Sequence, residues 1–167
     1  GIVTNKSIRI AGDDLTADIM EYMRHQHNIK IGERTAEEIK IQVGAAMSTL
    51  DNPPKDFVVQ GPNQMTALPI EVPVTYKEIA HCLEKSLSKI DAAIMSALEQ
   101  TPPELYADIV KNGIWLAGGG SLLRGLDKRL QNKIGITFNI ADDPLRAVVR
   151  GTGIALKNVD KFPFLIR

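Results

Sequence analysis

The sequence predicts an α/β fold in which helices cover a sheet and a small α+β subdomain is inserted into the chain. In the second half, helical patterns alternate with short apolar runs at 114–118 and 136–140, as helices and strands do in α/β domains. Between about 29 and 74, a helical pattern is followed by two strand-like runs around a Gly-Pro-Asn sequence. The 167 residues suffice for one large domain or two small ones. We therefore predict a core subdomain from residues 1–28 and 75–167 and a small outer subdomain from residues 29–74.

The composition argues against several classes of protein. Twenty basic residues balance 20 acidic ones, whereas nucleic-acid-binding chains usually carry a basic surplus, so we expect no nucleic-acid partner. Cys82 is the only cysteine, which forbids an internal disulfide and fits a reducing compartment. No apolar run approaches the roughly 20 residues of a membrane span, and no signal peptide is visible. The chain starts at Gly1 without an initiator methionine, so we expect a fragment or a processed product.

The first half of the chain predicts strands at both ends and helices between them. Residues 1–12 alternate apolar and polar side chains, which predicts two short strands or a hairpin. The next pattern is helical, with an aspartate as N-cap and an apolar face formed by Leu15, Ile19, Tyr22 and Met23. A second helix opens with a capping box, Thr35 and Glu38. Residues 57–74 predict two strands around the Gly-Pro-Asn turn.

The second half predicts four helices and two strands. The longest helix opens with a capping box, Thr75 and Glu78, and a shorter one follows with Thr101 as its cap. The run "IWLAG" predicts a buried strand with Trp115 in the core. A helix directly after the glycines, the strand "ITFNI" and a last helix capped by Asp143 complete the order.

The three glycines in "IWLAGGGSLLRGL" are the first candidate for a ligand site. A P-loop would need a lysine and a serine or threonine directly after its last glycine, and the dinucleotide fingerprint would need a glycine at Leu123. Residues without a Cβ still allow a ligand to approach the backbone, and a following helix would offer free N–H groups. A tight strand-to-helix turn without a ligand explains the same residues.

The second candidate is the pair Glu37 and Lys40, three residues apart on one flank of a predicted helix. A carboxylate can accept hydrogen bonds from ribose hydroxyls, and a lysine stem can lie along an adenine face while its ammonium stays in water. A surface ion pair with no ligand is the alternative.

Other chemically active residues indicate no second site. His25, His27 and His81 are not spaced as a metal set. Cys82 falls near an apolar helix face, where we expect it to be buried and unreactive. The terminal "FPFLIR" is expected to be packed or frayed and not a membrane anchor.

Five stretches resemble the MreB family of bacterial actin-like proteins, in the same order and spacing. They are "AGDDLTADIM", "IGERTAEEIKIQVGAA", "ALEQTPPELYADI", "LAGGGSLLRGLDKRL" and "ADDPLRAVVRGTGIAL". The resemblance runs over essentially all 167 residues and corresponds to the C-terminal half of the family's chain, most of its domain II. It implies an actin-like ATPase fold, in which two ribonuclease-H-like halves clamp ATP between them.

The resemblance also implies a function and a location. Proteins of this family assemble with ATP into membrane-associated filaments that organise cell-wall synthesis and rod shape. It implies a cytoplasmic protein, peripheral at the inner face of the cell membrane. The implied partners are other copies of the chain, the membrane complex of cell-wall synthesis and a cytoplasmic adaptor.

Carried over to this sequence, the resemblance implies two sets of contact residues. Glu37 would face the ribose, Lys40 the adenosine, and Gly12 would lie near the adenine. A loop beside the adenine and the α-phosphate would consist of Gly118, Gly119, Gly120 and Ser121. Residues around 51–74 would contact the next subunit of a protofilament.

The chain departs from the family pattern in what it lacks. The family's phosphate loops, the glutamate that positions the attacking water, the residues near Mg²⁺ and the membrane-inserting segment would all lie upstream of Gly1. Phosphoryl transfer needs in-line positioning and charge neutralisation. We therefore expect no catalytic residues here, weak nucleotide binding and no ATP hydrolysis by this chain alone. An apolar face made for the missing domain would be exposed, which predicts aggregation or dimerisation.

Two alternatives remain open from the sequence. The chain could be half of another ATPase or sugar kinase of the actin superfamily, although the Glu-Glu-Ile-Lys helix and the "TPPEL" segment argue against this. It could also be a non-enzymatic, truncated actin-like module that caps or poisons filaments.

Overall fold

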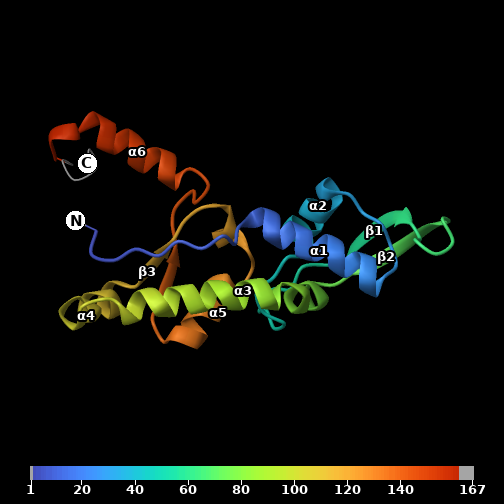
Figure 1. Cartoon of the computed structure of the whole chain (residues 1–167), viewed down its shortest axis with the longest axis horizontal. Coiled ribbons are helices and arrows are strands. Elements are labelled where there is room, and N and C mark those ends of the chain that lie inside the picture. The colour runs from blue at the N-terminus through green and yellow to red at the C-terminus, as the bar shows by residue number, and fades with distance from the viewer. Residues whose placement is uncertain (1, 162–167) are drawn as a thin grey trace.

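The structure is a computed structural model that describes residues 2–161, and the molecule is elongated along its longest helix, α3 (Figure 1). The elements in chain order are α1 (Gly12–Gln26), α2 (Glu33–Val43), β1 (Phe57–Pro62), β2 (Pro69–Val74), α3 (Tyr76–Glu99), α4 (Pro103–Asn112), β3 (Ile114–Leu116), the 3-10 turn η1 (Gly119–Leu122), α5 (Leu126–Ile134), β4 (Phe138–Ile140), α6 (Ala147–Lys157) and the 3-10 turn η2 (Val159–Lys161). The α/β class predicted from the sequence is confirmed.

The described strands form two separate two-stranded sheets. β1 and β2 pair antiparallel, with Phe57 opposite Val74. β3 and β4 pair in parallel, with Ile114 opposite Phe138, and α5 lies in the connection between them. A parallel pair needs such a crossover, so β3, α5 and β4 form a β-α-β unit. The predicted Gly-Pro-Asn turn lies slightly later than expected, because Gly61 and Pro62 still belong to β1.

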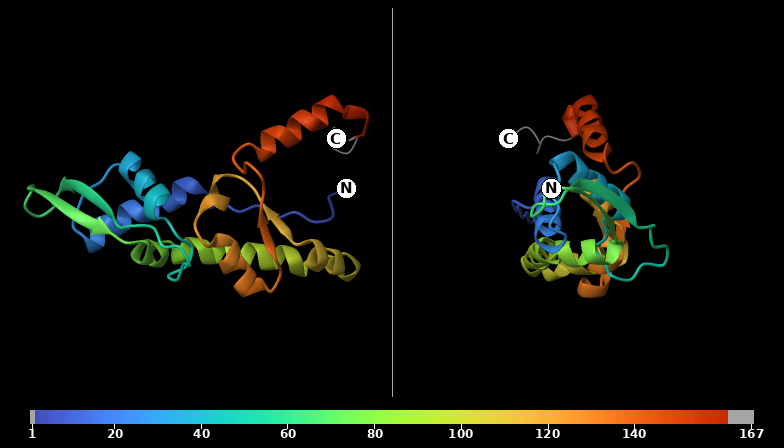
Figure 2. Two further views of the ribbon diagram at one scale, coloured as in Figure 1. Left: turned by 180° about the vertical axis from the view of Figure 1, so that it is seen from behind. Right: turned by 90° about the vertical axis from the view of Figure 1, so that its right-hand side faces the viewer.

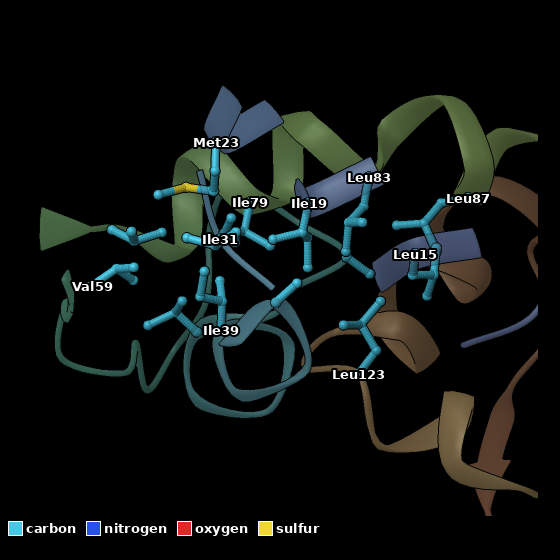
Figure 3. Close-up of a cluster of buried hydrophobic side chains, with 14 of the residues drawn as sticks. Leu15, Ile19, Met23, Ile31, Ile39, Val59, Ile79, Leu83, Leu87 and Leu123 are labelled. Carbon is cyan, nitrogen blue, oxygen red and sulfur yellow. The ribbon is translucent and has the colours of Figure 1, made fainter. Parts of the chain in front are cut away.

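One continuous hydrophobic cluster fixes the helices relative to one another (Figure 3). It is formed mainly by Leu15, Ile19 and Met23 of α1, Ala36, Ile39 and Val43 of α2, Val59, Val72 and Val74 of the first sheet, and Ile79, Leu83 and Leu87 of α3. Burying a large apolar side chain contributes about 1.5–3 kcal/mol, so this packing holds α1 against α2. Both predicted subdomains contribute to the cluster, and their boundary stays a prediction.

Helix α3 begins where its capping box predicts. The Thr75 backbone N–H donates to Oε1 of Glu78 at 2.5 Å, and the Glu78 N–H donates to Oγ1 of Thr75 at 3.3 Å. Each bond satisfies a backbone donor that has no partner within the helix. The buried face of α3 includes Ile79 and Leu83, and α3 packs against α1.

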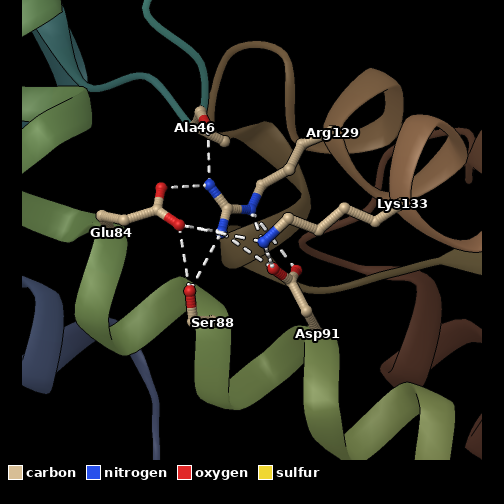
Figure 4. Close-up of polar contacts among 6 residues, drawn as sticks. All are labelled: Ala46, Glu84, Ser88, Asp91, Arg129 and Lys133. Atoms are coloured by element: carbon tan, nitrogen blue, oxygen red, sulfur yellow. Dashed lines mark hydrogen bonds and ion pairs between the residues drawn. The ribbon is translucent and has the colours of Figure 1, made fainter.

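A buried arginine joins α3, α5 and the segment after α2 (Figure 4). The Arg129 side chain is only 6% exposed and makes an ion pair of 2.6 Å with Glu84 and one of 2.8 Å with Asp91. Its Nη1 also donates to the carbonyl oxygen of Ala46 at 3.2 Å. Lys133 adds a second cation beside Asp91, at 2.6 Å. The guanidinium therefore connects three segments that are distant in sequence.

Several predicted helix starts are wrong by a few residues. Ala11, not an aspartate, is the N-cap of α1, and the Asp14 carboxylate accepts a hydrogen bond from its N–H instead. α2 starts at Glu33, so Thr35 already lies inside the helix and forms no capping box. The N-cap position of α4 is Pro102, which makes no side-chain capping bond. The Thr101 hydroxyl donates to the carbonyl of Ala97 and so does not cap α4.

The last helix is also shorter than predicted, because α6 begins only at Ala147. Asp143 has a φ of 48°, in the left-handed region, which separates it from a right-handed helix. Arg146 takes the N-cap position instead. The segment "FPFLIR" lies outside the described residues.

The predicted strands at the N-terminus are absent from residues 2–11. Within residues 2–161 no strand pairs with this segment, and an extended chain needs a partner for its backbone groups to form a sheet. The prediction that Trp115 lies in the core is wrong as well, since the residue is 66% exposed. β3 pairs only with β4, and the chain described here leaves one face of this small sheet uncovered.

An apolar face is exposed near α6; that it is the face made for another domain stays a prediction. The left view of Figure 2 shows this helix standing away from the other helices, and none of its residues is buried. The exposed large apolar residues of this region are Leu145, Val148, Val149, Ile154, Leu156 and Val159. Such a surface is unusual for a monomer that works alone. No helix among residues 2–161 is both long and apolar enough to cross a membrane.

Candidate functional site

Gly12 and Thr16 of α1 and Glu37 and Lys40 of α2 form one polar group, the Lys40 cluster. Nζ of Lys40 lies 2.6 Å from Oε2 of Glu37 and 2.9 Å from both the Gly12 carbonyl oxygen and Oγ1 of Thr16. An ammonium has three protons, and each has one of these acceptors. The Lys40 side chain is 14% exposed, so little of it faces solvent in this structure, and its placement beside an adenosine stays a prediction. The packing of α1 on α2 encloses it.

Glu37 presents one oxygen to the protein and leaves the other free. Oε2 accepts hydrogen bonds from Lys40 and, at 2.8 Å, from Oγ1 of Thr16. Within the described residues no hydrogen bond reaches Oε1, and the side chain is 47% exposed. The hydrogen bond from Lys40 lowers the pKa of Glu37, burial partly opposes this, and the hydrogen bond from Thr16 lowers it again. Glu37 is therefore an ionised acceptor for hydroxyl groups.

The glycine loop, residues 118–121, turns sharply after β3. Gly118 has a φ of 84° and a ψ of 170°, a conformation that is almost restricted to glycine. Its N–H donates to the carbonyl of Pro144 at 2.8 Å, and the buried Ser121 donates through Oγ to the Gly118 carbonyl at 2.7 Å. These bonds hold the loop in one conformation.

The predicted long helix directly after the glycines is wrong. Gly119–Leu122 form the 3-10 turn η1, and α5 begins only at Leu126. Gly125 has a φ of 74° in the left-handed region, which prevents a continuous right-handed helix. The free N–H groups of a long helix are therefore not what this loop offers to a ligand.

The end of α2 is joined to the segment that follows the glycine loop. The Ala46 N–H donates to the carbonyl of Arg124 at 2.8 Å. Nη1 of Arg124 donates to the carbonyl of Ile41 at 2.9 Å, which gives a partner to a carbonyl in the last turn of α2. Among the described residues no hydrogen bond joins the glycine loop directly to Glu37 or Lys40. The two regions are connected through Arg124.

The structure thus places the predicted site residues in two groups. Gly12, Glu37 and Lys40 come together in the Lys40 cluster, and the glycine loop forms the second group. Thr16 and Arg124 were missed. Thr16 follows Gly12 by four residues on one helix face, which is a usable signal. The contacts of Arg124 depend on the tertiary approach of α2, for which the sequence has no local signal.

Side chains outside these groups offer no competing chemistry. Burial, with smaller contributions from nearby carboxylates, raises the pKa of Cys82 to about 12, which disfavours the reactive thiolate; the residue is half-buried and not fully buried as expected. His27 lies 2.7 Å from Glu78. No group of three or more His, Cys, Asp or Glu residues suited to a metal occurs within residues 2–161.

Comparison with known proteins gives consistent matches along the whole chain. The MreB/Mbl protein family matches residues 1–163. The cell shape-determining protein Mbl of Bacillus subtilis is 39% identical over 162 residues, 97% of this chain and 48% of its own length. The cell shape-determining protein MreB of Escherichia coli is 41% identical over 160 residues, 96% of this chain and 46% of its own length. The chain therefore spans about half the length of the relatives it matches.

Solved structures agree with these relatives. Crystal structures of MreB5 of Spiroplasma citri, one bound to ADP and one to AMPPNP, superpose with a TM-score of 0.90 at 37% identity. They cover 96% of this chain and 48% of that protein. A mutant of MamK shares the fold with a TM-score of 0.65 at 22% identity. The chain has an actin-like fold and belongs to the MreB/Mbl family of cell shape-determining proteins.

Proposed function

We propose that this chain is one half of an actin-like ATP-binding protein that polymerises into membrane-associated filaments, which organise cell-wall synthesis and rod shape. In this proposal the free oxygen of Glu37 accepts hydrogen bonds from the ribose, and the stem of Lys40 lies beside the adenosine. Gly12 lies near the adenine, and the glycine loop lies beside the adenine and the α-phosphate.

The observation that carries the proposal is the divided role of the Glu37 carboxylate. Its Oε2 is held by two donors, whereas no hydrogen bond within the described residues reaches Oε1 of this half-exposed side chain. A fixed carboxylate with one free oxygen suits a ligand that carries neighbouring hydroxyl groups, such as a ribose. The ADP and AMPPNP in the Spiroplasma relative support a nucleotide as that ligand.

The tip of the β1–β2 hairpin supports the polymerisation part of the proposal. Met65 is 82% exposed and Leu68 is 64% exposed at the end of a projecting hairpin (Figure 1). Apolar side chains at such a site favour contact with another protein. We place the contact with the next subunit in residues 51–74. A double helical filament is formed by MamK, a protein with the same fold, which supports polymerisation and not a particular contact.

Hydrolysis requires more than this half supplies. Metal ions and in-line positioning groups carry most of phosphoryl transfer, and we assign these, with Mg²⁺, to the other half of the protein. The chain alone should turn over no ATP above background. Contacts with the membrane, the cell-wall complex and an adaptor are assigned to the complete filament.

Sedimentation of the complete gene product tests the proposal. With ATP the protein should pellet as polymer, and without nucleotide it should stay in solution. Met65→Glu should abolish pelleting and leave ATP binding unchanged, because the hairpin tip does not touch the Lys40 cluster. Gln131→Glu, which adds the same charge at an exposed position of α5 outside residues 51–74, is the control and should still pellet. Wild-type protein that binds no ATP or never pellets would refute the proposal.

A further inference from the structure

We propose that Thr16 is a positioning residue, which acts through Glu37 to set the preference of the site for ligands that carry ribose hydroxyls. The inference rests on the proposed nucleotide binding and adds to it a residue that determines specificity. Thr16 itself would touch no ligand.

Thr16 lies inside the Lys40 cluster and not on its surface. The residue is 3% exposed, in the first turns of α1. Its Oγ1 lies 2.8 Å from Oε2 of Glu37, 2.9 Å from Nζ of Lys40 and 2.9 Å from the carbonyl oxygen of Gly12. The contact with the Gly12 carbonyl is the usual bond of a helical threonine to the residue four positions earlier, whereas the contacts with Glu37 and Lys40 join Thr16 to another helix.

The protons of this cluster can be assigned. A hydroxyl has one proton to donate and two lone pairs to accept with. Because an ammonium can only donate, Thr16 must accept from Lys40. Its own proton then goes to the Gly12 carbonyl or to the Glu37 carboxylate, and the ionised oxygen forms the stronger bond. Oε2 of Glu37 is thus held from two directions.

The two hydrogen bonds to Oε2, from Lys40 and Thr16, fix the orientation of the carboxylate and so the direction of Oε1 of Glu37. An ammonium has no fixed direction for its three donors, so a carboxylate held by Lys40 alone can rotate and turn either oxygen, or both, to it. With Thr16 as a second, rigid donor, Oε2 stays in the cluster and Oε1 faces outward. Preorganisation of this kind raises the affinity for a ligand that hydrogen-bonds to Oε1. A ligand without hydroxyl groups at that place gains nothing from it.

The test compares two ligands on the complete gene product. Dissociation constants are measured by calorimetry for ATP and for 2′,3′-dideoxyATP, with wild-type protein, Thr16→Val and Thr16→Ser. Valine keeps the shape but removes the hydroxyl, whereas serine keeps the hydroxyl. The ratio of the two constants on one preparation does not depend on the folded fraction, so a destabilised variant still gives a valid result.

We expect Thr16→Val to weaken ATP binding about fivefold to tenfold, the factor that loss of one hydrogen bond typically produces. Binding of 2′,3′-dideoxyATP should change less than about twofold, and Thr16→Ser should restore the wild-type ratio. Equal weakening of both ligands, or no change in either, would overturn the role of Thr16 and leave nucleotide binding intact. Wild-type protein that binds neither ligand would overturn the inference together with the proposed function.

Discussion

The backbone nitrogen of Ala46 lies 2.8 Å from the carbonyl oxygen of Arg124, and this hydrogen bond connects the end of α2 to the segment after the glycine loop. The Arg124 side chain strengthens the connection through the carbonyl of Ile41. α2 carries Glu37 and Lys40, so the two candidate groups of the site are not independent. A change at this junction should affect both.

Gly44 at this junction should tolerate no side chain. A Cβ at residue 44 would lie 2.1 Å from the carbonyl oxygen of Lys40 and 3.1 Å from Cδ1 of Leu123. The backbone of α2 would have to move, so Gly44→Ala should lower the free energy of unfolding by about 1–3 kcal/mol. Urea denaturation measures this. The control is Gly151→Ala in α6, where nothing lies within 4 Å, and its stability should be unchanged or higher. Equal stability of the two variants would contradict the close approach.

Arg129 should contribute strongly to stability because it neutralises buried Asp91. Arg129→Met removes the guanidinium and leaves Lys133 as the remaining cation beside that carboxylate. Loss of one partner of a buried ion pair costs about 3–5 kcal/mol, and the remaining lysine places the expected effect at the lower end. The control is Lys128→Met, since its ion pair with Asp51 is exposed and should matter little. If chemical denaturation gives the two variants the same loss of stability, the ion pairs of Arg129 do not stabilise the fold as proposed.

Glu84 should make the fold sensitive to acid. The hydrogen bond from Arg129 lowers the pKa of this carboxyl from its ordinary value of 4.5 to about 2. Between these values the unfolded chain binds more protons than the folded one, so acidification favours unfolding. The stabilisation is complete above about pH 4.5 and declines as the pH falls toward about 2. Glu84→Gln should flatten the dependence of the urea midpoint on pH in this window, and an unchanged slope would exclude Glu84 as its source.

The isolated chain should self-associate through the apolar face at α6. Val149 and Leu156 are 72% and 71% exposed, and burial of such side chains against a second copy would be favourable. Sedimentation velocity should show a species larger than a monomer that grows with concentration. Val149→Lys together with Leu156→Lys should shift it to the monomer, whereas Lys157→Ala should not. A wild-type chain that stays monomeric at all concentrations would show that this face does not drive association.

Periodicity and caps predicted the helices and the class of the fold. The helix faces that contain Ile19, Ile39 and Leu83 are buried as expected, because an apolar stripe on a helix is stabilised by packing against another element. The predicted helix ends were less accurate: Thr35 is a good cap by residue type but lies inside α2, and the Thr101 hydroxyl donates to the Ala97 carbonyl instead of capping α4.

The site was predicted only where its residues lie close in sequence or match the family. Glu37 and Lys40 are three residues apart, and their pairing follows from helix geometry. The contacts of the Lys40 ammonium depend on α1, the preceding helix, whose acceptors lie 28 and 24 residues away in the sequence, so the spacing within α2 did not reveal them. The exposure of Trp115 has a similar cause, because an apolar run does not reveal which of its faces is covered by the same chain.

The most direct measurement is a calorimetric titration of ATP into the complete gene product and into the variants Glu37→Ala and Glu38→Ala. The two glutamates are neighbours on α2 with side chains 47% and 49% exposed, but only Glu37 belongs to the Lys40 cluster. We predict that ATP binds to the wild type, that Glu37→Ala weakens binding at least about tenfold, and that Glu38→Ala changes it less than about twofold. Equal affinities of the two variants, or a wild type that does not bind ATP, would contradict the assignment of this cluster to a nucleotide.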